Sequence, residues 1–169
     1  MRLRFPALLF LAFSLAACST TTVYIVRHAE KVDETDSTDL SPAGKQRAIA
    51  LADTLAKRGI DSIFTTPYRR TRQTAEPLAQ RLSLQLVDYA PKLTSALVDR
   101  VNRIRTKTVL VVGHSNTVLD IARGLGASPT LRTIESGDFD NLFVLRIKRG
   151  LFGRTIDLSE KTYGQPTQP

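Results

Sequence analysis

The chain has 169 residues, with 24 Lys and Arg against 16 Asp and Glu, and its formal net charge is +8 at pH 7. This length suits one domain with a buried hydrophobic core, and the single cysteine excludes an internal disulfide. The basic excess favours anionic partners such as phosphate esters or anionic lipid. Nucleic acid is not expected as a partner, because the chain has no Trp and its basic clusters lack interleaved aromatic side chains.

The first 18 residues indicate export. Two arginines precede an apolar run that is shorter than a membrane-spanning helix. The sequence LAAC at residues 15–18 is similar to the lipobox of bacterial lipoproteins, which implies lipidation at Cys18. Ser19 resembles the sorting signal of outer-membrane lipoproteins, which implies a protein in a Gram-negative cell envelope that faces the periplasm. We expect a signal peptide over residues 1–17 and a tether over 18–22. An ordinary signal peptide with an incidental cysteine is the alternative.

Turn residues and apolar runs predict alternating strands and helices after the tether. A strand is expected over residues 23–26, followed by a polar loop at 33–39. Ser41 suits a helix N-cap, Pro42 the first helical position and Gly59 the end of that helix.

The same alternation continues to the end of the chain. Thr66 is expected to cap a second helix that Pro67 opens and Pro77 bends. Residues 108–114 are apolar almost throughout, as in a strand buried on both faces, whereas residues 141–149 alternate as an edge strand would. The remaining expected elements are strands at 61–66, 84–89 and 154–159 and helices at 94–104 and 116–123.

This pattern predicts an α/β fold, a three-layer α/β/α sandwich with a mostly parallel central sheet. We expect one domain over residues 23–160 and a disordered tail over 161–169.

The chain has two histidines, and each follows a predicted core strand. His28 comes after the strand at 23–26, and His114 ends the strand at 108–114. Ligands of open α/β sheets bind outside the carboxyl ends of the strands. A single histidine there is more often structural, but two histidines at the same sheet edge favour a functional site.

Two arginines extend this candidate site. Arg27 adjoins His28, and Arg70 lies in the first turn of the predicted second helix. Two guanidinium groups, two imidazoles and a helix N-terminus suit a tetrahedral dianion. No further His or Cys stands at metal-ligand spacing, so no metal is expected. A serine hydrolase is disfavoured because the sequence GHSNT lacks the glycine pair of a nucleophile elbow.

Four blocks of the sequence resemble the histidine phosphatase superfamily, which includes the phosphoglycerate mutases and bacterial phosphohistidine phosphatases. VRHAE is similar to the signature of that family, with Ala29 in place of the commoner glycine. LSPAGKQRA resembles its first helix start, TTPYRRTRQTA its arginine segment and VVGHSNT its second histidine strand. The second arginine of YRRTR, Arg70, aligns with the arginine of the family's pocket.

The resemblance implies a phosphoglycerate mutase-like fold and a phosphatase that forms a phosphohistidine on His28. Arg27, Arg70 and His114 would bind the phosphoryl oxygens, assisted by backbone amides near Asn116. No metal or other cofactor is implied, because the arginines supply the positive charge.

The sequence departs from the family pattern at the position of the proton donor. Larger members place an acidic residue after the third strand, where this chain offers only Asp88 and Asp99; Glu30 and the segment 135–138 are further candidates. The missing acid favours activated phosphates, whose leaving groups need less protonation. The short chain leaves no room for a cap domain, so we expect an open site for a phosphorylated small molecule or macromolecule.

Two other functions stay open. A non-catalytic envelope lipoprotein could use the same basic socket to bind anionic ligands, and a nucleic-acid-binding module has only the basic charge in its favour. We expect a monomer bound to the membrane through its N-terminal lipid, with the site facing away from the membrane because the first strand runs away from Cys18.

Overall fold

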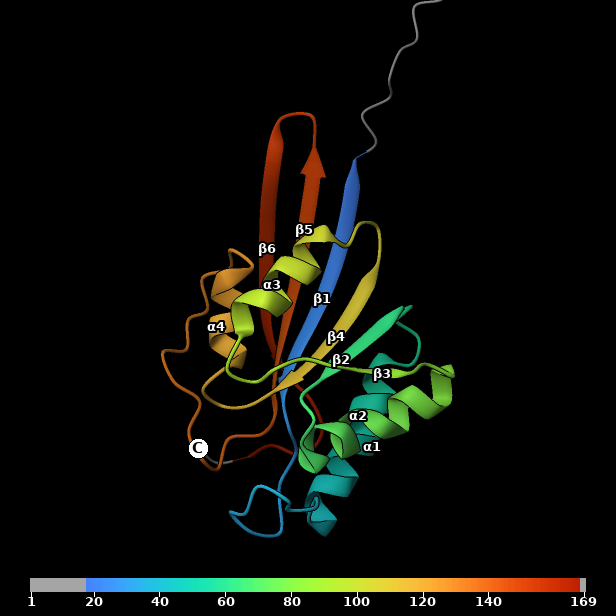
Figure 1. The fold of residues 1–169 in the computed structure, drawn as a ribbon, viewed down its shortest axis with the longest axis vertical. Helices are drawn as coiled ribbons and strands as arrows, with labels where there is room; N and C mark the ends of the chain where they lie inside the picture. The colour runs from blue at the N-terminus through green and yellow to red at the C-terminus, as the bar shows by residue number, and fades with distance from the viewer. Residues whose placement is uncertain (1–17, 168–169) are drawn as a thin grey trace, which may run out of the picture.

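The computed structural model describes residues 18–167, and the predicted signal peptide at 1–17 lies outside the described residues. Six strands and four helices alternate along the chain (Figure 1). Their bounds are β1 Ser19–Arg27, α1 Pro42–Leu55, β2 Ser62–Thr65, α2 Arg69–Leu82, β3 Leu86–Asp88, α3 Thr94–Arg103, β4 Thr108–Gly113, α4 Val118–Gly124, β5 Asn141–Gly150 and β6 Gly153–Thr162. No helix within residues 18–167 is both long enough and apolar enough to cross a membrane.

The strands form one mixed sheet in the order β3-β2-β4-β1-β5-β6. The first four strands in this order are parallel to one another, whereas β5 is antiparallel to both β1 and β6. The predicted α/β fold with a mostly parallel sheet is therefore confirmed.

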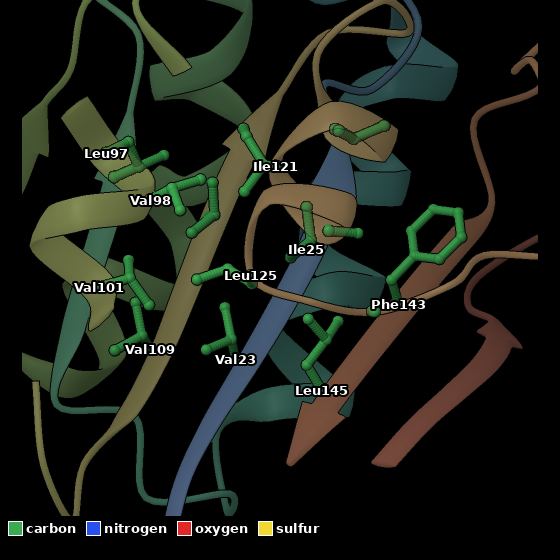
Figure 2. Packing of buried hydrophobic residues seen from close by; sticks show 14 of the residues in the cluster. Val23, Ile25, Leu97, Val98, Val101, Val109, Ile121, Leu125, Phe143 and Leu145 are labelled. Atoms are coloured by element: carbon green, nitrogen blue, oxygen red, sulfur yellow. The ribbon is translucent and has the colours of Figure 1, made fainter. Parts of the chain in front are cut away.

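Helices cover both faces of the sheet, because its central strands are apolar on both sides. On one face, α3 and α4 pack on strand residues such as Val23, Ile25 and Val109 (Figure 2). On the other face, α1 and α2 pack on Val26 and on residues of β2 and β4. Among the described residues, those of the hydrophobic core lie between positions 23 and 163, all within residues 19–169.

The first helix begins as predicted, but the second does not. Ser41 Oγ accepts a hydrogen bond from the amide of Gly44 at 3.1 Å, so it caps α1. The N-cap of α2 is Tyr68, which makes no side-chain cap, whereas Thr66 bonds to His114 instead. Helix α2 is continuous through Pro77, with buried Ala75 and Leu78 on either side of it, so the helix does not restart there.

The predicted tether over residues 18–22 is wrong, because β1 begins at Ser19. Residues 19–22 pair antiparallel with residues 146–149 of β5, which extends further than the other neighbour of β1. The prediction that residues 141–149 form an edge strand, made from their alternating pattern, is also wrong. Strand β5 lies between β1 and β6, and β6 is the edge strand.

The predicted disordered tail is wrong up to residue 167. Tyr163 is buried, and buried Arg47 donates hydrogen bonds to the carbonyls of Tyr163 and Gln165. The amide of Thr167 donates to Asp140 Oδ2 at 2.9 Å. Residues 168–169 lie outside the described part of the chain.

Candidate active site

The parallel pairing of β1 with β4 brings the two histidines together. Arg27, the last residue of β1, lies opposite Gly113, the last residue of β4. The backbone amide of His28 donates to the Gly113 carbonyl at 2.9 Å. As a result, the rings of His28 and His114 lie 5.4 Å apart between centroids, in an edge-to-face arrangement.

Both histidines line an open cleft of about 550 Å³ at the carboxyl edge of the sheet. The lining comes from the ends of β1 and β4, the start of α2 and the loops around them. The lining residues are Arg27, His28, Lys31, Glu34, Tyr68, Arg70, Pro91, Lys92, His114, Ser115, Asn116, Thr117, Ile134 and Ser136. The structure thus places Arg27, His28, Arg70, His114 and Asn116 around one cleft, as the sequence predicts.

The ring of His28 is held as a neutral imidazole. Its Nδ1 lies 2.9 Å from the carbonyl oxygen of Ala29, which can only accept, so Nδ1 bears the proton and Nε2 keeps its lone pair. Burial lowers the pKa of His28 to about 3, and the positive charges of Arg27 and Arg70 act in the same direction. His28 therefore has the protonation state of a nucleophile at neutral pH.

Arg27 is fixed by the loop before β5. Its Nη1 donates to the carbonyls of Glu135 and Asp138 at 2.7 and 2.9 Å, and its guanidinium lies 4.1 Å from the ring centroid of Phe139. The side chain is buried, and its Nε finds no hydrogen-bond partner among the described residues. Burial lowers the pKa of Arg27, yet a guanidinium stays charged. This unpaired buried donor is suited to an anion in the cleft.

Arg70 approaches from the first turn of α2. Its Nη1 donates to the carbonyl of Asp36 at 3.1 Å, and its guanidinium lies 4.3 Å from the ring centroid of Tyr68. The Asp36 carboxylate lies 3.7 Å from its Nη2. Because Asp36 is exposed and its contact is long, most of the positive charge of Arg70 remains available to the cleft.

His114 is oriented by a chain of hydroxyl groups. Its Nε2 bonds with Thr66 Oγ1 at 3.0 Å, and Thr66 Oγ1 bonds in turn with Thr71 Oγ1 at 2.8 Å. Burial lowers the pKa of His114 to about 4, and Arg70 and Arg27 add to this effect. The amides of Thr117 and Val118 donate to the His114 carbonyl, so they are not free to bind an anion as the predicted amides near Asn116 would.

Neither predicted acid after the third strand lines the cleft. Asp88 forms an ion pair with Arg72 and accepts from Thr65 Oγ1. Asp99 is exposed on the surface of α3. Neither carboxylate is therefore placed next to the two histidines in this structure.

The other predicted acids are also engaged elsewhere. Glu30 is bound by both Nε and Nη2 of Arg47, at 2.8 to 3.0 Å, on the far side of the loop. Within the segment 135–138, Ser136 lines the cleft, whereas Glu135 and Asp138 face Thr133 and Thr167. Glu30 contributes to the attachment of the C-terminal residues through Arg47 and does not line the cleft.

Sequence reasoning missed the one carboxylate that lines the cleft, Glu34. It lies in the polar loop at 33–39, whose ends are joined by the bridge between Lys31 and Leu40. Its side chain is 91% exposed and pairs with Lys31. An irregular acidic loop has no periodicity that would direct a side chain toward the site, so no sequence signal could have selected Glu34.

Within residues 18–167, no group of three or more His, Cys, Asp or Glu side chains is arranged to hold a metal ion. The cationic groups around the cleft are Arg27, Lys31, Arg70 and Lys92.

The two buried histidines make stability fall with acid. Their folded-state pKa values, about 3 and about 4, lie below the ordinary histidine value of 6.5. Below pH 6.5 these histidines are protonated in the unfolded chain but remain neutral in the folded chain. The free energy of unfolding therefore falls as pH falls toward 4. Each histidine contributes a slope of up to about 1.4 kcal/mol per pH unit. Urea unfolding of the wild type and of His114→Asn, each at pH 7 and pH 5, measures this effect. The free energy of unfolding should fall less between the two pH values in the variant, and an equal fall in both proteins would contradict the prediction.

Comparison with known proteins finds matches to part of the sequence and to the fold. The sequence model of the histidine phosphatase superfamily (branch 1) matches residues 23–94. The uncharacterized protein Rv0525 of Mycobacterium tuberculosis is 37% identical over 71 residues, which are 38% of this chain. The match spans only 35% of the length of that relative.

Solved structures of phosphatases share the fold over most of their length. The protein histidine phosphatase SixA, solved with tungstate, matches with a TM-score of 0.61 and 19% identity, over 83% of this chain and 96% of its own. The mycobacterial glucosyl-3-phosphoglycerate phosphatase Rv2419c, solved with VO3, matches with a TM-score of 0.65 and 16% identity, over 85% of this chain and 99% of its own. Residues 23–94 thus match the histidine phosphatase superfamily model, and the chain shares the fold of these two phosphatases.

Proposed function

We propose that this protein is a phosphatase that hydrolyses activated phosphates through a phosphohistidine on His28. The observation that carries the proposal is the hydrogen bond from His28 Nδ1 to the Ala29 carbonyl, which leaves Nε2 with its lone pair beside two arginines. The fold shared with SixA and with Rv2419c, both phosphatases by name, supports the same reaction class.

The proposed reaction has two displacements at phosphorus. The Nε2 lone pair of His28 attacks the phosphorus atom, a P–N bond forms, and the bond to the leaving oxygen breaks. The leaving oxygen takes a proton from water. A second water molecule then attacks the phosphohistidine and gives a proton to the hydroxide left by the first step. The P–N bond breaks, its electron pair returns to Nε2, and phosphate leaves while His28 returns to its neutral form.

Arg27, Arg70 and His114 would hold the phosphoryl oxygens during both steps. The two guanidinium groups offset the charge that builds on these oxygens, and their fixed positions reduce the cost of reorganisation in the transition state. In this mechanism the arginines supply the positive charge, so we expect activity to persist in the presence of EDTA.

The cleft favours substrates with good leaving groups. Its only lining carboxylate is exposed and ion-paired, so leaving oxygens receive little help from a protein acid. Phosphohistidine, acyl phosphates and aryl phosphates depart more readily than alkyl phosphates. The opening of the cleft and its lysines, Lys31 and Lys92, also suit a phosphorylated macromolecule.

Phosphate release by residues 19–169 tests this proposal. The substrates are p-nitrophenyl phosphate, a phosphohistidine peptide and glycerol phosphate, all in EDTA. We expect release from the first two and little from the third. Alkaline quenching during turnover, followed by peptide mass spectrometry, should show a phosphate adduct on His28. Rapid turnover of glycerol phosphate would contradict the preference for activated phosphates.

Absence of release from all three substrates, in a folded protein that binds tungstate, would favour the alternative function. The chain would then be a binding protein for anionic ligands that uses the same cleft. Calorimetric titration with tungstate distinguishes this outcome from a damaged site, because a damaged site would bind no tungstate.

Glu34 is not expected to be the proton donor. Because its carboxylate is exposed and paired with Lys31, Glu34→Gln should change kcat by less than about threefold on aryl and alkyl phosphates alike. Steady-state kinetics with p-nitrophenyl phosphate and glycerol phosphate measure this. A loss of tenfold or more confined to the alkyl phosphate would instead identify Glu34 as a general acid.

A further inference from the structure

The turn between β5 and β6 exposes two large apolar side chains. Gly150 pairs with Gly153, so Leu151 and Phe152 occupy the two turn positions, where Gly, Asn and Asp are usual. Leu151 is 74% exposed and Phe152 is fully exposed at 101%. Figure 1 shows this turn beside the start of β1 and far from the end of that strand. The cleft lies at that other end of β1, where Arg27 and His28 line it.

Three arginines gather beside this turn. Arg105 and Arg149 both donate to the backbone carbonyl of Asn102, and Arg154 donates to its side-chain Oδ1 at 3.0 Å. Among the described residues, no carboxylate lies within ion-pair distance of any of the three. Their charges affect one another, since Arg105 and Arg154 add to the burial that lowers the pKa of Arg149. The cluster is therefore an uncompensated positive charge.

The apolar turn adjoins the arginines through Arg149. A hollow of about 360 Å³ is lined by both turn residues, by Arg149 and by Cys18 at the start of β1. Arg149 lies opposite Arg154 in the hairpin and shares Asn102 with Arg105 and Arg154. We call the set Leu151, Phe152, Arg105, Arg149 and Arg154 the hairpin-tip surface.

We propose that the hairpin-tip surface docks on an anionic phospholipid bilayer. The side chains of Leu151 and Phe152 would enter the boundary between headgroups and acyl chains, and the guanidinium groups would bind lipid phosphates. Two apolar side chains are too few for the roughly 1,000 Å² that a stable protein interface buries. A bilayer needs no such area, because apolar insertion and electrostatic attraction add together.

Docking in this way would orient the active site. Strand β1 runs nine residues from Ser19, beside the hairpin tip, to Arg27 at the cleft. At about 3.3 Å per residue this strand is about 25–30 Å long. The cleft would then face away from the bilayer, open to substrates from the aqueous side. The surface lies beside Cys18, so it would act together with the lipid predicted at that residue, yet it does not depend on it.

Vesicle binding by residues 19–169 tests the proposal without any lipid on the protein. Cosedimentation compares vesicles of phosphatidylcholine alone with vesicles that contain 30 mol% phosphatidylglycerol. We expect binding to the anionic vesicles that weakens with salt. Leu151→Ser with Phe152→Ser should reduce it at least tenfold, and Arg105→Gln or Arg154→Gln about fivefold each. The matched controls Ile49→Ser and Lys45→Gln, exposed on α1, should bind as the wild type does.

A fluorescence measurement locates the contact. Because the chain has no Trp, Phe152→Trp introduces a single reporter at the tip, and Ile49→Trp provides its control on α1. We expect anionic vesicles to shift the emission of the tip tryptophan to the blue and brominated lipid to quench it, with no change for the control.

Three results would overturn the proposal. The first is no binding to anionic vesicles, and the second is binding that the tip variants do not weaken. The third is a dimer, seen by analytical ultracentrifugation without vesicles, that the double serine variant dissociates. Phosphatase activity in solution should be equal in wild type and the double serine variant, so a failure of lipid docking is distinguishable from a failure of the proposed reaction.

Discussion

His28→Gln is expected to lower the rate of phosphate release by about 10⁵-fold. Glutamine is close to histidine in size, but its amide nitrogen has no available lone pair, so no covalent intermediate can form. The remaining groups of the cleft would still bind the phosphoryl oxygens, so KM should change much less than kcat. Initial rates with p-nitrophenyl phosphate, at substrate concentrations that span KM, measure both constants.

Two controls make this result specific to the nucleophile. Tungstate titration of His28→Gln should give a dissociation constant within about tenfold of the wild type, since Arg27 and Arg70 remain. Thermal unfolding should show a folded protein. Activity within tenfold of the wild type would mean that His28 is not the nucleophile and would end the proposed mechanism.

Arg27→Ala is expected to lower kcat/KM by about 10³-fold, the upper range for loss of one preorganised donor to a developing negative charge. The substitution removes a buried guanidinium and also the two hydrogen bonds to the carbonyls of Glu135 and Asp138. The loop before β5 should loosen, because the contact with Phe139 is lost as well. Steady-state kinetics and amide hydrogen exchange over residues 135–139 report the two effects separately.

Arg27→Lys separates charge from geometry. An ammonium group keeps the charge but cannot hold the loop and a phosphoryl oxygen at once, so we expect at least half of the loss of Arg27→Ala on a logarithmic scale. Arg58, an exposed arginine between α1 and β2 that does not line the cleft, provides the control, and Arg58→Ala should leave kcat/KM unchanged. Full activity in Arg27→Lys would show that Arg27 acts through its charge alone.

The sequence predicted the carboxyl ends of β1 and β4 to within one residue, because short-range patterns determine them. Residues 108–113 are buried almost throughout and follow the pattern expected of a central strand. The same logic placed both histidines at one sheet edge, since parallel strands end together there. The cap at Ser41 was predictable for a similar reason, because its chemistry depends on residues only three positions away.

Contacts between distant segments could not be predicted from these patterns. The sequence predicts Thr66 as a helix cap. In the structure its hydroxyl group forms a hydrogen bond with His114, because β2 and β4 are neighbours in the sheet. Glu30 looks like a candidate acid until the fold brings Arg47 to it. The prediction of a disordered tail was wrong for the same reason, since buried Arg47 also donates hydrogen bonds to the carbonyls of Tyr163 and Gln165.

The pairing of β1 with β4 also sets the order in which the protein can gain activity as it folds. The backbone bond from His28 to Gly113 joins segments that are far apart in the chain, and β2 must lie beside β4 before Thr66 can orient His114. Such non-local pairings form late and slowly. Helical structure should therefore return well before activity when the denatured chain is diluted into buffer. If the protein releases phosphate as proposed, the return of that release would time the pairing of β1 with β4 during refolding.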